Sequence, residues 1–172
     1  MISEEARITL ALGIVSAAFL CGFWFAPGGV LALRRRAGGE LQVDLRFSYT
    51  PETLYRLLDL YGEDGRRSFR NLLLADMIFP AVYAATLYSL GGLIASAHPF
   101  AVTAVAVGRC AGIAAALFDY GENLFLLYVL RNLKSRSDRI ARLAGICTTL
   151  KVVAFAATAA AFAAALLAAP QG

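Results

Sequence analysis

Long apolar runs separated by short charged segments dominate this chain. The first run, 8–33, contains no charged residue, and about 20 apolar residues are enough for a helix to cross a bilayer. The same pattern predicts further helices, so the expected spanning helices are about 5–33, 66–97, 100–130 and 139–169. We therefore expect an all-α, multi-pass membrane protein, an antiparallel four-helix transmembrane bundle that forms a single domain over residues 1–172.

Two prolines should interrupt these helices. A Pro-Gly-Gly sequence at 27–29 lies inside the first run, so regular helix should kink or end near Ala26. Pro80 has no amide hydrogen and should kink the second helix, which would free the carbonyl of Asp76. Irregular backbone at membrane depth is tolerated only within protein or beside a cavity. Pro80 and Asp76 therefore mark a candidate site.

The main polar segment, 37–70, carries a helix start of its own. Thr50 is a favourable N-cap, and Pro51 suits the first helical position. Leucines recur at helical spacing after it, which predicts a short amphipathic helix at about 51–62, before a Gly-Glu-Asp-Gly break. This helix either lies at the membrane surface or packs on the bundle as a cytoplasmic cap.

The composition favours insertion into lipid. Hydrophobic residues make up 59% of the chain and charged residues 16%, whereas charged residues make up about 25% of an average soluble domain. A soluble domain of 172 residues would leave too much of this apolar surface in water. The net charge of +4 comes from a few basic clusters without a basic, aromatic-rich face, so we expect no nucleic-acid binding.

The cysteines, the single histidine and the N-terminal residues argue against several other kinds of functional site and against a cleaved signal peptide. The cysteines (Cys21, Cys110 and Cys147) lie in apolar runs without a CxxC motif, so we expect them to be packing residues. The single histidine, His98, lies in a predicted turn, which leaves no Ser-His-Asp triad and no histidine-rich zinc site. The acidic start of the chain and the length of the first run argue against a cleaved signal peptide.

Basic residues predict which connectors lie in the cytoplasm. Three arginines follow the first helix, and Arg66, Arg67 and Arg70 begin the second. The segment after the third helix is basic as well, and positive residues accumulate on the cytoplasmic side. We therefore expect a cell-membrane protein with loops 34–70 and 131–139 in the cytoplasm and both termini outside. Arg66, Arg67 and Arg70 are also candidates for binding lipid headgroups.

Polar residues on the third helix predict a buried face. Asp119, Glu122 and Asn123 are spaced i, i+3 and i+4, so they share one side of the helix. Gly108 and Gly112 lie on the same side, and small residues at this spacing let helices approach closely. This stripe should face the bundle interior, where charged groups need partners.

Distances from the turns predict which residues of the other helices lie beside this stripe. Asp76 and Asp119 are about equally far in sequence from the turn near His98. Asp119 and Lys151 are about equally far from the turn near Ser135. With a rise of about 1.5 Å per residue, the three side chains should lie at one depth to within about one helical turn.

This cluster supports two interpretations. As a structural lock, it would hold the helices in register, with Lys151 and Asp119 as the main pair. As a functional site, it would use Asp76, Asp119 and Glu122 as catalytic acids and bases. The same oxygens suit a hard cation such as Mg²⁺, but the pattern is too short for us to assign a metal.

The remaining residues of the predicted site would shape it and balance its charge. Lys151 would balance the acids and Asn123 would orient them. A tyrosine beside a buried acid more often packs than binds, but its hydroxyl can contact a ligand. The ligand-binding candidates are Asn123, Lys151, Tyr83, Tyr120 and Pro80.

The leading hypothesis is that the bundle binds or modifies a hydrophobic small molecule or lipid between its helices. The first alternative is an accessory subunit of a larger membrane complex, with a purely structural polar cluster. The second is a small ion- or proton-coupled transporter, which would need to oligomerise. We expect no cofactor. A homo-oligomer and a membrane-complex partner both stay open, as does enzymatic activity.

Overall fold

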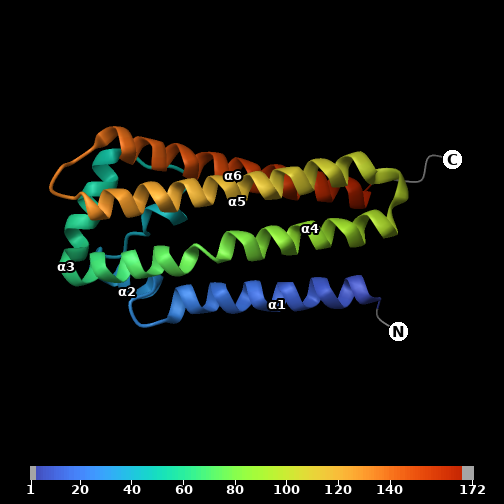
Figure 1. The fold of residues 1–172 in the computed structure, drawn as a ribbon, viewed down its shortest axis with the longest axis horizontal. Coiled ribbons are helices and arrows are strands. Elements are labelled where there is room, and N and C mark those ends of the chain that lie inside the picture. The colour runs from blue at the N-terminus through green and yellow to red at the C-terminus, as the bar shows by residue number, and fades with distance from the viewer. Residues whose placement is uncertain (1–2, 168–172) are drawn as a thin grey trace.

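A computed structural model of the chain describes residues 3–167 and is helical apart from its connectors (Figure 1). Four helical stretches, at 4–36, 51–97, 99–131 and 138–167, are long and apolar enough to cross a membrane. The predicted all-α class and the four apolar helices of membrane-spanning length are thereby confirmed. The expected end of the last helix, at about 169, lies outside the described residues. The elements are α1 (Glu4–Phe25), α2 (Val30–Arg36), η1 (Val43–Leu45), α3 (Pro51–Asp76), α4 (Phe79–Ala97), η2 (Pro99–Ala101), α5 (Val102–Arg131) and α6 (Asp138–Leu167).

The first apolar run forms two helices. Ala26 caps α1 in an extended conformation, which confirms the predicted end of regular helix. Gly28 then adopts a φ of 83°, a value that glycine reaches without steric cost, and the chain turns into α2. The helix that we expected at 5–33 is therefore divided by the Pro-Gly-Gly turn, and α2 ends in the three arginines.

The helix α3 begins where the sequence predicts. The Thr50 hydroxyl accepts a hydrogen bond from the amide of Thr53, and Pro51 is the first helical residue. Gly62 interrupts the helix with φ 64° and ψ −172°, so α3 consists of two helical parts that meet at this residue. The part before Gly62 buries Leu54, Leu57 and Leu58 against α5 and α6, in the core cluster that contains Leu126 and Ala144. This contact favours a cap that packs on the bundle over a helix that lies apart from it at the membrane surface.

The second expected helix, 66–97, is broken beside Pro80. The helix α3 ends at Asp76 and α4 begins at Phe79, with two turn residues between them. Pro80 cannot donate a backbone hydrogen bond to the carbonyl of Asp76, and the amides of Met77 and Ile78 instead bond three residues back. The break therefore lies directly beside the first candidate acid.

The helices α5 and α6 lie side by side along most of their length (Figure 1). Gly108 on α5 faces the ring of Phe162, and a methyl group at this position would overlap that ring. Gly108 and Gly112 are both buried, which confirms the prediction that this glycine stripe faces the interior. Close packing of the two helices brings their polar side chains into contact.

The helix α1 lies at the edge of the molecule, beside α4 (Figure 1). None of its described residues is buried. Hydroxyl groups join it to α4: Thr9 Oγ1 lies 2.6 Å from Ser89 Oγ, and Ser16 Oγ lies 3.0 Å from Thr86 Oγ1. The helix α1 therefore forms an outer wall of the molecule, with a cavity between it and the other helices.

Candidate functional site: a polar network beside an apolar cavity

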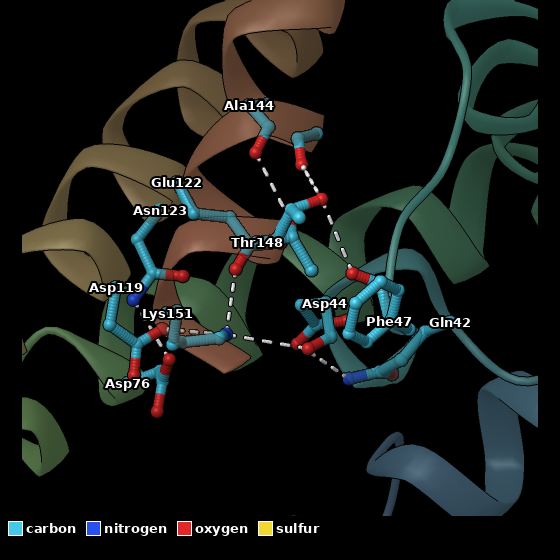
Figure 2. A network of polar contacts seen from close by, with 12 residues as sticks. Gln42, Asp44, Phe47, Asp76, Asp119, Glu122, Asn123, Ala144, Thr148 and Lys151 are labelled. Atoms are coloured by element: carbon cyan, nitrogen blue, oxygen red, sulfur yellow. Dashed lines mark hydrogen bonds and ion pairs between the residues drawn. The ribbon is translucent and has the colours of Figure 1, made fainter. Parts of the chain in front are cut away.

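Lys151 on α6 is the centre of a network of polar side chains (Figure 2). Its Nζ atom lies 3.0 Å from Asp119 Oδ1 and 2.6 Å from Glu122 Oε2, both on α5. Nζ also donates to the backbone carbonyl of Asp44, at 3.4 Å. An ammonium group has three hydrogens, and all three have acceptors here.

Glu122 lies at the fully buried end of this network. The side chain of Glu122 is fully buried, and that of Lys151 is 11% exposed. The hydroxyl of Thr148 donates to Glu122 Oε1, so both carboxylate oxygens of Glu122 have a partner. Removal of the lysine from this buried carboxylate would leave an uncompensated charge inside the protein.

Asp119 and Asp76 lie at the other end of the network. Tyr83 on α4 donates its hydroxyl hydrogen to Asp119 Oδ2 at 3.1 Å. Asn123 Nδ2 donates to Asp76 Oδ2 at 2.8 Å. Asp76 is half-buried, and no ion pair joins it to a basic residue within 3–167. The helix break at Pro80 places this acid at the end of α3, where its side chain reaches α5.

The connector between α2 and α3, residues 37–50, contributes residues that the sequence interpretation missed. Gln42 Nε2 donates to Asp44 Oδ2 at 3.0 Å. The connector lies against α6 at Gly145, where a Cβ atom would be 2.6 Å from the carbonyl oxygen of Tyr49. The absence of a side chain at Gly145 therefore makes room for the connector backbone, and this glycine was the one available signal of the contact.

The connector carries two buried ionisable groups. Burial raises the pKa of the Asp44 carboxyl group, although the nearby ammonium group of Lys151 opposes this effect. Burial also raises the pKa of the Tyr49 phenol, and the charge of Glu122 acts in the same direction. Within the described residues the Asp44 carboxylate forms no ion pair, whereas Glu122 pairs with Lys151.

A cavity of about 470 Å³ lies between α1 and the rest of the molecule. Ligand pockets commonly have volumes of about 300–1,000 Å³, mostly apolar walls and a few polar groups. The apolar side chains of its wall include Leu20, Phe23, Trp24, Leu87 and Phe155. The polar side chains of its wall include Gln42, Asp44, Arg46, Asp76, Tyr83, Asp119 and Lys151. Glu122 and Asn123 do not line it, so Asp76 and Asp119 are the predicted acids that border the cavity.

The other residues that the sequence predicted for the site do not line this cavity. Pro80 is buried at the helix break. Tyr120 is half-buried, but it neither lines the cavity nor hydrogen bonds to the network. Arg66 donates to the carbonyl of Leu58, and Arg67 pairs with Glu63 at 3.5 Å. Within the described residues, neither these two arginines nor the exposed Arg70 forms an ion pair with Asp76, Asp119 or Glu122.

The network does not have the arrangement of a metal site. Within residues 3–167 no group of three or more histidine, cysteine, aspartate or glutamate side chains could hold a metal ion. The ammonium group of Lys151 occupies the position between Asp119 and Glu122 where a cation would have to lie. Positive charge at this point is therefore supplied by the chain itself.

The arrangement is suited to binding an amphiphilic molecule and to proton transfer at Asp76 or Asp119. Both carboxylates border an apolar space, and Tyr83 holds Asp119 in one orientation. Neither a protein-family model, nor a curated protein, nor a solved structure matches this chain. Function is therefore inferred from the cavity and the network.

Proposed function

We propose that this chain spans a membrane as an antiparallel four-helix bundle and binds a hydrophobic small molecule or lipid in the cavity behind α1. Loops 34–70 and 131–139 would lie in the cytoplasm, and both termini would lie outside. The observation that carries the proposal is that Asp76 and Asp119 border a mostly apolar cavity of about 470 Å³. A few polar groups at one wall of an apolar cavity are typical of ligand sites.

The two interpretations of the polar cluster apply to different parts of it. Glu122, Thr148 and Lys151 form a closed set of contacts, which supports a structural role for that part. Among the residues that the structure describes, Asp76 is hydrogen bonded only to the amide of Asn123, and it borders the cavity, which supports ligand binding there. Asp76 and Asp119 are the residues that we propose as acid and base if the bound molecule is also modified.

The alternative of an accessory subunit keeps one specific observation in its favour. The contacts of Lys151 with Asp119 and Glu122 hold α5 and α6 together, and this function requires no ligand. If the chain had only this role, a substitution that fills the cavity would not impair its function. The two proposals therefore differ in what happens when the cavity is filled.

Two adjacent valines on α6 provide the test. Val152 lines the cavity, whereas Val153 does not and is 51% exposed. The Val152→Trp and Val153→Trp proteins would be purified from membranes in parallel with the wild type, and co-purified organic molecules would be identified by mass spectrometry. We expect a molecule that the wild type and Val153→Trp retain and Val152→Trp loses. Equal retention by all three folded proteins would reject the cavity as a binding site.

The proposed topology has its own test. A cysteine-free background carrying either His98→Cys or Ser135→Cys would be treated in intact cells with a membrane-impermeant maleimide. The turn at His98 should react from outside, and the connector at Ser135 should react only after the cells are opened. The reverse pattern would contradict the proposed orientation.

A further inference from the structure

Two residues that line the cavity carry buried hydrogen-bond acceptors that have no donor within the described residues. Gln42 is 2% exposed and lines the cavity, and its Oε1 atom has no hydrogen-bond partner. Asp44 Oδ1 is also buried without a partner, and Asp44 lines the same cavity. A buried acceptor without a donor is destabilising, so such an acceptor calls for an explanation.

The orientation of the Gln42 side chain follows from its neighbour. Its Nε2 atom donates to Asp44 Oδ2, and an ionised carboxylate can only accept. The amide oxygen of Gln42 is therefore held away from Asp44 Oδ2. The other unpartnered buried side-chain oxygens of the described residues belong to Tyr49, Tyr61 and Asn123, none of which lines the cavity.

Both basic side chains of the wall already have acidic partners. Lys151 binds Asp119, Glu122 and the carbonyl of Asp44. Arg46 pairs with Glu40 at 2.9 Å and donates twice to the carbonyl of Leu41. Within the described chain, neither Asp44 nor Asp76 forms an ion pair through its carboxylate. The wall therefore offers two buried acceptors without a donor, and two carboxylates, Asp44 and Asp76, that form no ion pair within the described residues.

We infer that the cavity binds a lipophilic amine, whose protonated amino group donates to Gln42 Oε1 and Asp44 Oδ1 while its apolar body lies against α1 and α4. An ammonium group carries three donors, no acceptor and a positive charge, which match the unpartnered acceptors and the unpaired carboxylates of the wall. Asp76 adds negative potential in the same space. The ligand class rests on the proposed function, because it requires a molecule in this cavity.

Ligands with other polar ends match the wall less well. A fatty alcohol supplies one donor and no charge, so Asp44 and Asp76 stay uncompensated. A fatty acid supplies a carboxylate, which the acids of the wall repel. Hydrogen bonds between charged partners are roughly twice as strong as neutral ones, so the amine should bind most tightly.

The only tryptophan in the chain is a reporter for this cavity. Trp24 lines it, and a bromine atom nearby quenches indole fluorescence. The full chain in phosphatidylcholine nanodiscs would be titrated with 11-bromoundecylamine, 11-bromoundecanol and 11-bromoundecanoate. Val152→Phe, which narrows the cavity without adding a tryptophan, measures quenching from the surrounding lipid. We expect saturable quenching by the amine at an at least about tenfold lower concentration than by the alcohol, equivalent to about 1.4 kcal/mol.

Two carboxylate variants show whether the wall causes this preference. Asp44→Asn should reduce the advantage of the amine to less than about threefold, and Asp59→Asn, an exposed acid outside the cavity, should leave it unchanged. If Asp44→Asn fails to fold, the comparison of the three probes on the wild type decides the result. An advantage that survives in Asp44→Asn would overturn the inference.

The outcomes separate this inference from the proposed function. Equal saturable quenching by alcohol and amine, abolished in Val152→Phe, would overturn the amine and leave the cavity as a binding site. Absence of saturable quenching by any probe would also overturn the amine. In that case the molecules retained by Val153→Trp and lost by Val152→Trp would still decide the proposed function.

Discussion

Lys151 on α6 and Asp119 on α5 form an ion pair, with 3.0 Å between Nζ and Oδ1, at the boundary between the closed polar network and the cavity. Both residues line the cavity, whereas Glu122, the second partner of Lys151, does not. The same lysine therefore stabilises the contact between two helices and forms part of the cavity wall. Variants at this boundary should separate effects on stability from effects on binding.

Lys151→Met should destabilise the protein strongly, because it leaves Asp119 and Glu122 without their cation. Removal of one partner from a buried ion pair costs about 3–5 kcal/mol. The measurement is the free energy of unfolding in mixed micelles of a mild detergent and dodecyl sulfate. Lys134→Met, at an exposed lysine in the α5–α6 connector, should change it by less than about 0.5 kcal/mol. Similar losses in the two variants would show that the buried pair does not stabilise the fold.

Asp76→Asn should affect binding more than stability. The asparagine oxygen can still accept from Asn123 Nδ2, so the free energy of unfolding should change by no more than about 1 kcal/mol. Asp119→Asn, which removes the charge paired with Lys151, should cost more. Unfolding would be compared with the amount of co-purified ligand. If Asp76→Asn destabilises the protein as much as Asp119→Asn, Asp76 is part of the structural contact.

Gly145→Ala should displace the connector from α6. Its Cβ atom would lie 2.6 Å from the carbonyl oxygen of Tyr49, and forced overlap of this kind costs about 1–3 kcal/mol. Trypsin cleavage after Arg46, in the connector, should become faster. Gly13→Ala on α1 is the control, because no atom lies within 4 Å of its added methyl group. Unchanged cleavage in Gly145→Ala would contradict the packing of the connector.

Lowering the pH should destabilise the start of the 37–50 connector, because Glu40 becomes protonated and loses its ion pairs with Arg46 and Arg56. The guanidinium groups of Arg56 and Arg46 lower the pKa of the Glu40 carboxyl group from 4.5 to about 2. Because the unfolded chain binds the proton more tightly, this carboxylate contributes stability above pH 4.5, which is lost as the pH falls towards 2.

The difference in unfolding free energy between the wild type and Glu40→Gln measures this contribution. It should favour the wild type at pH 6 and disappear near pH 2. A difference that stays constant over this range would show that the two arginines do not act on the ionised form of Glu40.

Local signals predicted much of the helical structure. The end of α1 near Ala26 and the start of α3 at Thr50 follow from proline, glycine and capping residues, whose effects act over a few positions. The equal distance of Asp119 and Lys151 from their turn agrees with their contact at 3.0 Å. Two helices joined by a short turn have little freedom to slide, so counting residues locates such pairs.

The connector 37–50 could not be placed in the same way. It has no periodic pattern, and its position depends on contacts with α6, about one hundred residues later in the chain. Gln42 and Asp44 read as ordinary loop residues in the sequence. Their importance arises only when Gly145 lets the backbone approach α6 and brings both side chains to the cavity.

The central claim is that a small molecule occupies the cavity between α1 and the acids of α3 and α5. The most direct measurement is a high-resolution structure of the chain purified in its native lipids, without added ligand. We expect non-protein density that extends from Trp24 to Asp76 or Asp119. A structure in which α1 packs directly against these residues and leaves no space for a ligand would contradict it.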